Sequence, residues 1–195
     1  MKRQTTALIR SGFLAAAIML SYLQAGCPSN NTPAAAPPTP TPCSAHFGND
    51  QSTGLLASQS TGSLVCYPVT LSQATTALDM GAYTASTSTG NINLALYTDD
   101  GGSPSKPLSL LASSGDNPVT AVSWNVYSLT KTALLPAVYW IGFEVSTSCS
   151  FPHAITTTRQ YSVSQAYGPW PAAMPTTGTA TSGVRAISLY LDTCP

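Results

Sequence analysis

Histidine and glutamate, the side chains most often used for acid–base chemistry near neutral pH, are scarce in this chain. Its 195 residues include two histidines, His46 and His153, and one glutamate, Glu144. Nucleophilic hydrolysis needs a serine or cysteine beside a histidine that a third group orients, and no Gly-x-Ser-x-Gly motif occurs. We interpret both histidines as loop residues. The sequence therefore predicts no catalytic, metal or cofactor site.

The single glutamate raises the question of a carboxylate pair. Glycoside hydrolysis on a β-sandwich usually uses two carboxylates at a fixed separation. A partner for Glu144 would have to be an aspartate such as Asp79 or Asp192, and no motif links either residue to it. We interpret Glu144 as a solvent-facing strand residue. A secreted polysaccharide hydrolase that uses Glu144 is kept as an alternative.

Three aspartates stand in turn-forming sequences. Asp99 and Asp100 precede a glycine pair, and Asp116 lies between a glycine and an asparagine. Carboxylates in such loops can bind calcium. Asp-Gly and Asp-Asn are also ordinary turn sequences, and no Asp-x-Asp-x-Asp array is present. We predict that these residues shape turns.

An aromatic and proline-rich segment is the best candidate for ligand recognition. It contains Tyr167 and Trp170 within Tyr-Gly-Pro-Trp-Pro, and Tyr161 lies a short way upstream. Aromatic rings on loops form platforms for the C–H faces of sugars, and neighbouring prolines lower the cost of ordering such a loop. The alternative is that Trp170 packs into the end of a sandwich core, because tryptophan is usually well buried.

The cysteines are compatible with disulfide bonds. Cys43, Cys66, Cys149 and Cys194 follow the first cysteine, Cys27. An even number in an exported chain predicts two disulfides, for which three pairings are possible. Cys43 and Cys194 open and close the predicted domain, and domain termini often lie close together. We therefore favour Cys43–Cys194 together with Cys66–Cys149.

The first 26 residues have the three parts of a secretory signal. Three basic residues lie within the first ten positions, an uncharged apolar run follows at 13–20, and small residues lead to Cys27. The apolar run is shorter than the ~20 residues that cross a bilayer as a helix. The sequence predicts a signal peptide over 1–26.

The ending Ala25-Gly26-Cys27 resembles the lipobox of bacterial lipoproteins. The resemblance implies that the Cys27 sulfur carries a diacylglyceryl group and that fatty-acyl chains, palmitate among them, hold the protein on a membrane. Two or more such chains make a stable anchor. Pro28, in place of an inner-membrane retention aspartate, favours the outer membrane. The alternative is a secreted or periplasmic protein, cut near Ala25, in which Cys27 is free or paired.

Residues 27–42 form a proline-, alanine- and threonine-rich stretch. Proline fixes φ and lacks a backbone donor, so we expect neither helix nor sheet here. An extended tether of this composition rises ~3.1 Å per residue and would hold the next domain roughly 40–50 Å from the membrane. Residues 43–195 are long enough for one domain with its own core.

Charge is scarce in the chain. Charged residues make up 7% of it, against a typical ~25%. Without the signal peptide, seven acidic and four basic residues leave a formal charge of −3. The lack of a basic patch argues against nucleic-acid binding. The partners that we expect are the membrane, through the lipid, and a glycan or envelope protein.

Apolar residues in the predicted domain recur at every second position. The alternation occurs at 91–97, 122–126, 139–145 and 187–192, with turn sequences between these runs. Period two over short runs predicts strands with one buried face. We predict an all-β domain, an antiparallel β-sandwich of the jelly-roll type. The residues expected to face its core are Ile92, Leu94, Leu96, Val122, Trp124, Val126, Tyr139, Ile141, Phe143, Val145, Ile187, Leu189 and Leu191.

Three short motifs occur in a fixed order: Leu-Tyr-Thr-Asp at 96–99, Leu-Leu-Ala-Ser-Ser at 110–114 and Tyr-Trp-Ile at 139–141. This order resembles a recurrent bacterial and phage β-sandwich module that is appended to surface, adhesion and carbohydrate-active proteins. The resemblance implies a non-catalytic jelly-roll binding domain. The sequence as a whole thus predicts a lipid-anchored envelope module for binding or adhesion, with a purely structural envelope lipoprotein as a further alternative.

Overall fold

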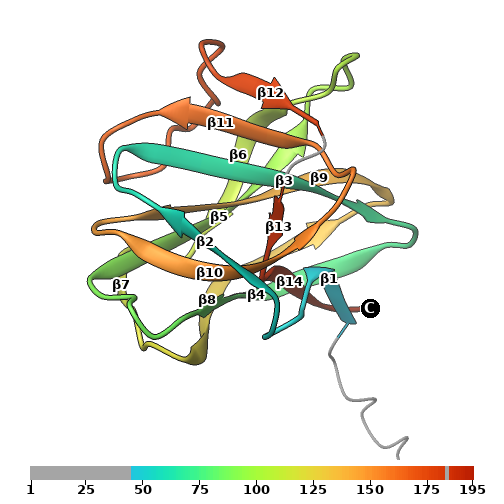
Figure 1. Ribbon diagram of the computed structural model, residues 1–195. Helices are drawn as coiled ribbons and strands as arrows, with labels where there is room; N and C mark the ends of the chain where they lie inside the picture. The colour runs from blue at the N-terminus through green and yellow to red at the C-terminus, as the bar shows by residue number, and fades with distance from the viewer. Residues whose placement is uncertain (1–44, 183–184) are drawn as a thin grey trace, which may run out of the picture. The chain divides into compact units, whose positions relative to one another are not determined.

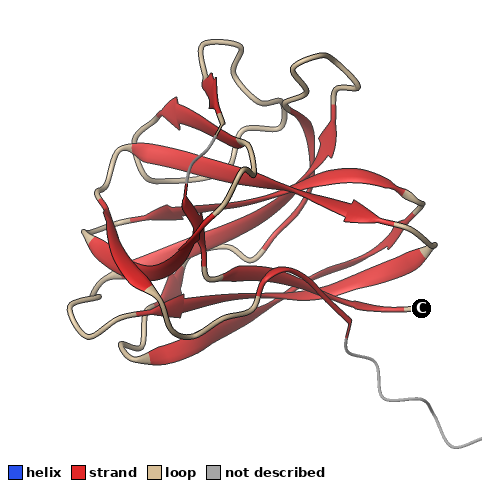
Figure 2. Cartoon of the chain, turned by 45° about the vertical axis from the view of Figure 1, so that its right-hand side comes forward, coloured by secondary structure: helices blue, strands red, loops and turns tan. Residues whose placement is uncertain are grey.

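Antiparallel strands account for nearly all of the regular structure, as the two-residue periodicity predicts (Figure 2). The computed structural model describes residues 45–182 and 185–195, which belong to a compact unit spanning 41–195. The predicted signal peptide, Cys27, the tether and Cys43 lie outside the described residues. Among those residues, no helix is long and apolar enough to cross a bilayer.

The first sheet has the strand order β1-β14-β4-β8, and every neighbouring pair is antiparallel (Figure 1). Its two edges are formed by the strand that opens the described chain and by the longest strand of the fold. The bounds are β1 (Ala45–Asn49), β14 (Leu189–Cys194), β4 (Thr75–Thr84) and β8 (Ser123–Leu134).

The second sheet has the order β12-β11-β3-β9-β5-β6, and a short strand, β7, also pairs with β5. Its central strands β3, β9 and β5 lie side by side in Figure 1. The bounds are β12 (Thr179–Thr181), β11 (Gln160–Ser164), β3 (Ser63–Leu71), β9 (Ala137–Val145), β5 (Asn91–Asp99), β6 (Pro107–Ser113) and β7 (Asn117–Pro118).

A jelly roll is a double sheet of eight strands that contains two Greek keys. Its eight strands are here β1, β3, β4, β5, β6, β8, β9 and β14. In chain order, the first, eighth, third and sixth of them form one sheet, and the second, seventh, fourth and fifth form the other. The alternation between sheets confirms the predicted jelly-roll sandwich.

The connection between the last two jelly-roll strands, β9 and β14, is long and carries additional structure. It contributes β11 and β12 to the second sheet, and it places β10 between β13 and β2 in a separate three-stranded sheet. The bounds are β10 (Cys149–Ile155), β13 (Arg185–Ile187) and β2 (Leu55–Gln59).

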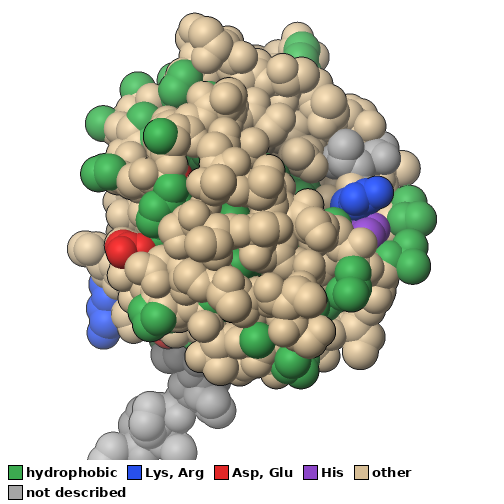
Figure 3. Space-filling view, turned by 60° about the vertical axis from the view of Figure 1, so that its left-hand side comes forward, with side chains coloured by type: hydrophobic (Ala, Val, Ile, Leu, Met, Phe, Trp, Pro, Cys, Tyr) green, Lys and Arg blue, Asp and Glu red, His purple; other side chains and the backbone are tan. Residues whose placement is uncertain are grey.

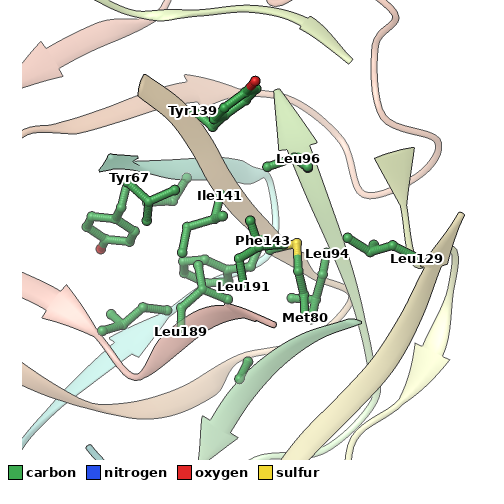
Figure 4. Close-up of a cluster of buried hydrophobic side chains, with 14 of the residues drawn as sticks. Tyr67, Met80, Leu94, Leu96, Leu129, Tyr139, Ile141, Phe143, Leu189 and Leu191 are labelled. Atoms are coloured by element: carbon green, nitrogen blue, oxygen red, sulfur yellow. The ribbon is translucent and has the colours of Figure 1, made fainter. Parts of the chain in front are cut away.

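The main core lies between the sheets and is built from the alternating positions that the sequence shows (Figure 4). Leu94 and Phe143 enter it from the second sheet, and Met80 and Leu191 enter it from the first. All four side chains are fully buried. The predicted core faces of 91–97, 139–145 and 187–192 are confirmed, since all their apolar members belong to this cluster.

The prediction for 122–126 is wrong about the face. Val122 precedes β8 and is 61% exposed, and Val126 within the strand is also exposed. The apolar residues of β8 that face the core are Tyr127, Leu129 and Leu134. Trp124 instead packs on the outer face against Tyr83 and Tyr190, with ring centroids 5.5 and 4.9 Å away. Trp124 therefore belongs to an aromatic cluster on the outer face of the first sheet.

The expectation of a single buried face also fails for the second sheet. Its outward-pointing residues form a second buried cluster, which includes Cys66, Tyr97, Trp140 and Tyr161. Residues 165–178, the loop between β11 and β12, cover this cluster with Trp170 and Met174. We call this segment the covering loop.

The Cys66–Cys149 disulfide prediction is wrong, because both cysteines are free and buried. Cys66 belongs to the second cluster, on the outer face of the sheet, whereas Cys149 lies in the main core, so a sheet separates them. Cys194 is not a free cysteine. Its predicted partner, Cys43, lies outside the described residues, and the Cys43–Cys194 pairing stays a prediction.

Candidate functional site

Two tyrosines of the second sheet hold the covering loop in place. The Tyr97 hydroxyl donates to the carbonyl oxygen of Pro171 at 2.6 Å, and the Tyr161 hydroxyl donates to that of Pro175 at 2.6 Å. Prolines accept at these carbonyls and have no N–H that would need a partner. The loop is therefore fixed through the only backbone hydrogen-bonding group that proline has.

Backbone hydrogen bonds to the edge strand β6 hold the other side of the loop. The Leu110 N–H donates to Ala172 O at 3.0 Å, and the Met174 N–H donates to Leu108 O at 2.8 Å. Ser109 and Ala173 form an isolated antiparallel bridge between these two bonds. The loop thus extends the sheet edge and has a defined position over the sheet.

A pocket of about 400 Å³ opens where the covering loop meets β5 and the turn between β6 and β7. Its floor and one side come from the sheet and that turn, and its other side comes from the loop. The lining residues are Asn93, Ser113, Gly115, Asp116, Tyr167, Gly168, Pro169 and Trp170. Its volume lies within the ~300–1,000 Å³ of small-molecule sites.

Asn93 forms the polar floor of this pocket, and Glu144 lies behind it. They lie opposite one another on β5 and β9, and the Asn93 Nδ2 donates to Glu144 Oε1 at 3.3 Å and to Gly168 O at 3.2 Å. Glu144 is only 1% exposed. The interpretation of this glutamate as solvent-facing is therefore wrong, because the covering loop closes over its side of the sheet.

Burial raises the pKa of Glu144 to about 7, because the charged carboxylate loses its hydration. The nearby negative charge of Asp116 acts in the same direction, whereas hydrogen bonds from the Gly168 backbone and the Asn93 amide partly offset the rise. A carboxyl group with this pKa exists in both protonation states near neutral pH. It can accept or donate a hydrogen bond.

Asn93 and Trp170 line the pocket, and Glu144 lies behind Asn93. Three buried polar atoms of these residues make no hydrogen bond within the described part of the protein: Asn93 Oδ1, Glu144 Oε2 and Trp170 Nε1. Their residues are 5%, 1% and 7% exposed. Leaving a buried donor or acceptor without a partner costs ~1–3 kcal/mol. Such atoms gathered at one pocket are typical of a binding site, where a ligand or water completes the hydrogen bonds.

Asp116, on the rim of the pocket, is already satisfied. Its Oδ2 accepts from Asn91 Nδ2 at 2.8 Å, and its Oδ1 accepts from the Tyr167 hydroxyl. Burial raises the pKa of that Tyr167 hydroxyl, and the hydrogen bond to Asp116 adds to the rise. The pair fixes the Tyr167 ring against the β6–β7 turn.

The three aromatic residues predicted to bind a ligand lie in different surroundings. Tyr167 is half-buried and lines the pocket, and Trp170 lines it with most of its surface packed on the sheet. Tyr161 lies beneath the loop, where its ring meets Trp140 edge-on at 6.4 Å. The expected open platform is therefore wrong for Tyr161. The structure instead brings Tyr167 and Trp170 together with Asn93 and Asp116.

The carboxylates considered as partners of Glu144 lie elsewhere. Asp79 and Asp192 face one another on β4 and β14 of the first sheet, and their neighbours Met80 and Leu191 point into the main core. Asp79 and Asp192 thus project from the outer face of the first sheet, whereas Glu144 lies on the outer face of the second sheet. Asp116 is the carboxylate whose negative charge raises the pKa of Glu144.

Both histidines lie in strands, so their interpretation as loop residues is wrong. His46 in β1 stacks on Tyr190 with ring centroids 4.1 Å apart. His153 in β10 is buried, and burial lowers the pKa of its imidazole, which favours the neutral form. Neither lines the pocket beside Trp170.

The predicted turns at Asp99 and Asp100 are confirmed. Asp99 Oδ2 accepts from the Gly101 N–H at 2.9 Å, and Asp100 Oδ1 accepts from the Gly102 N–H at 2.9 Å. The hydrogen bond from Gly102, together with one from the Lys106 N–H, lowers the pKa of Asp100. Asp99 also accepts from Trp140 Nε1 at 2.6 Å. Within residues 45–182 and 185–195, no three potential ligands gather in a way that would hold a metal ion.

A larger pocket, of about 460 Å³, opens between the two sheets near β1 and β3, and His46 and Tyr67 are among its lining residues. None of the unpartnered buried polar atoms found in the described residues belongs to its lining. The face of the molecule in Figure 3 carries few charged side chains, and its apolar side chains form small, separate patches. The pocket beside Trp170 is therefore the best candidate site.

Asn93 is the residue of this site that the sequence analysis missed, and Asp116 was assigned only a turn role. Asn93 lies just before the Leu-Tyr-Thr-Asp motif, and its neighbours in sequence form no motif that would mark it as a site residue. Only the register that places it opposite Glu144 gives it significance. An outward polar residue within a strand of apolar neighbours is the one signal that points to it.

Comparison with protein-family models, curated proteins and solved structures gives no match to this chain. The class of protein is therefore defined by its own fold and site. It is a jelly-roll β-sandwich with a polar pocket on the outer face of one sheet, closed on one side by a proline-rich loop.

Proposed function

We propose that this protein is a lipid-anchored, non-catalytic module of the bacterial cell envelope that binds a glycan or a protein ligand in the pocket beside Trp170. Binding or adhesion is its role in this proposal. It stands on the outer membrane, and a secreted or periplasmic form is the alternative location.

The observation that carries the proposal is the set of unpartnered polar atoms at the pocket. Asn93 Oδ1 and Trp170 Nε1 belong to residues that line the pocket, and four hydrogen bonds from Tyr97, Tyr161 and β6 anchor the loop that covers them. A fold that only needed to pack this face would place apolar atoms there, because unmade buried hydrogen bonds lower stability.

The lipid anchor and the location rest on the sequence. The basic start, the apolar run and Ala25-Gly26-Cys27 support lipidation at Cys27, and the proline-rich tether that follows supports display away from a membrane. The order of the motifs at 96–99, 110–114 and 139–141, which resembles that of modules in surface and carbohydrate-active proteins, supports a binding role.

A binding screen with two matched variants tests the proposal. We expect Tyr167→Ala, which removes a pocket wall, to weaken binding of the full-length chain to a glycan array or to isolated envelope material at least tenfold. Tyr83→Ala removes a half-buried tyrosine from the opposite sheet and should leave binding unchanged. Equal binding by the Tyr167→Ala and unaltered chains would end the assignment to this pocket. No binding by either would favour a purely structural role.

Polysaccharide hydrolysis is the second candidate function, favoured by the Glu144 pKa of about 7 and by the charge of Asp116 nearby. Against it stands the position of Glu144 behind Asn93, where 1% of its surface is exposed. An activity screen on envelope and plant polysaccharides decides between the two. Turnover that Glu144→Gln abolishes would replace the binding proposal with an enzymatic one.

A further inference from the structure

We infer that the pocket beside Trp170 selects a neutral ligand that carries several hydroxyl groups and has about the size of one or two sugar rings. This inference rests on the proposed binding role and adds the chemical class of the ligand. It is argued from the hydrogen-bonding groups that the pocket leaves unpartnered, from its charge and from its size.

The unpartnered groups are of both kinds. Asn93 Oδ1 is an acceptor and Trp170 Nε1 is a donor, and both residues line the pocket. The Asn93 amide nitrogen is already used by Glu144 and Gly168, which fixes its carbonyl oxygen as the free end. A ligand must therefore both donate and accept within one small volume.

A hydroxyl group does both, since it has one donor hydrogen and two acceptor lone pairs. An ammonium group has donors only, so it would leave Trp170 Nε1 without a partner. A carboxylate or phosphate has acceptors only, so it would leave Asn93 Oδ1 without one. A polyhydroxylated ligand is the class that satisfies the set.

The charges at the site lead to the same class. Asp116 and Glu144 are the acidic groups here, and they disfavour an anion. Asp116 offers little to a cation, because Asn91 and Tyr167 already donate to its two oxygens. A neutral ligand avoids both the repulsion and the cost of removing a charge from water.

The size and the walls fit a compact ring. A volume of about 400 Å³ is near the lower end of small-molecule sites. Tyr167, Pro169 and Trp170 supply apolar surface beside the polar floor, and aromatic rings pack well on the C–H faces of sugars. The wall is rigid, because the hydrogen bonds from Tyr97 and Tyr161 hold the loop before any ligand enters.

Indole N–H resonances give a direct test, because the chain has three tryptophans in three different environments. Trp140 donates to Asp99, Trp124 lies on the opposite sheet, and only Trp170 has an unpartnered indole at the pocket. The full-length chain is titrated with a panel of neutral mono- and disaccharides, and with glucosamine, glucuronate and tetramethylammonium as charged probes. We expect at least one neutral sugar to shift the Trp170 signal alone and to bind at least tenfold more tightly than the charged probes.

Trp170→Phe keeps an aromatic ring and removes the donor, and it should weaken the neutral sugar about fivefold, as expected for one lost neutral hydrogen bond. Trp124→Phe is the matched control and should change nothing. Equal or tighter binding of a charged probe, or no response of Trp170 to any sugar, would overturn the inference. In that case Tyr167-dependent binding to envelope material would show that the proposed function survives, and its loss as well would show that both fail.

Discussion

The hydroxyl of Tyr97 in β5 donates to the carbonyl oxygen of Pro171, 74 positions further along the chain, at 2.6 Å. The Tyr97 ring also contacts that of Trp170, with centroids 5.8 Å apart. One side chain of the jelly roll thus positions two consecutive residues of the covering loop. The pocket depends on this contact because Trp170 is part of its wall.

Removing this hydroxyl should loosen the loop without unfolding the sandwich. We expect Tyr97→Phe to lower the free energy of unfolding by about 1–3 kcal/mol, since a buried carbonyl loses its donor. Urea unfolding measures the change. Tyr83→Phe is the control, since no hydrogen bond ties its hydroxyl to the described residues, and a similar loss in that variant would contradict the assigned role of Tyr97.

The close approach of Trp170 to the sheet requires glycine at position 142. A Cβ at this position would lie 2.6 Å from Cys66 Sγ and 2.9 Å from Trp170 Cη2. We expect Gly142→Ala to destabilise the fold by about 1–3 kcal/mol through overpacking and to shift Trp170 fluorescence. Gly168→Ala has open space for its Cβ and should be close to neutral. Unchanged unfolding of Gly142→Ala would contradict this packing.

Glu144 should make stability depend on pH. Its pKa is raised from 4.5 to about 7 in the folded state, so the native state holds its proton more tightly than the unfolded state does. The contribution is complete below pH 4.5 and is lost as the pH rises to about 7. Glu144→Gln does not titrate and should lack this dependence.

The difference in unfolding free energy between the original chain and Glu144→Gln should therefore change by roughly 3 kcal/mol between acidic and mildly alkaline solution, with the variant gaining as the pH rises. Chemical unfolding of both proteins at a series of pH values gives this difference. Parallel profiles for the two proteins would show that Glu144 does not titrate in this range.

The two buried thiols should be protected in the folded protein. Burial raises the pKa of both Cys66 and Cys149, and buried thiols of high pKa react slowly. We expect iodoacetamide to label neither in native protein and both in unfolded, non-reduced protein. Peptide mapping by mass spectrometry identifies the labelled residues. A Cys66–Cys149 crosslinked peptide would contradict the separation of the two side chains by a sheet.

Cell fractionation tests the proposed lipidation of Cys27. We expect the original chain in the outer-membrane fraction, labelled by radioactive palmitate, and Cys27→Ser in the soluble fraction without label. Cys66→Ser serves as the control, because a buried cysteine of the folded domain should not affect sorting. The same distribution of the Cys27→Ser and original chains would remove the lipid anchor from the proposal.

The fold was largely predictable, because its main core follows a local rule. Leu94 and Phe143 are buried where alternation places them, and the turns at Asp99 and Asp100 form from their own side chains. The face of β8 was not predictable. Trp124 faces outward because Tyr83 and Tyr190 lie beside it, and these contacts join residues far apart in sequence.

The site was predictable only in part for the same reason. The aromatic segment suggested recognition, and Tyr167 and Trp170 do line a pocket. The burial of Glu144 and its contact with Asn93 depend on strand register and on a loop that returns from beyond β11. Alternation along one strand contains no information about what covers its second face.

The long connection between β9 and β14 supplies one wall of the pocket, and the jelly-roll strands supply the floor. Asn93 and Glu144 belong to β5 and β9, whose alternate residues form the main core. Trp170 and Pro169 belong to an insertion that leaves and re-enters the sandwich. Substitutions in the exposed part of the covering loop can therefore change the wall of the pocket while the strands that carry its floor stay the same.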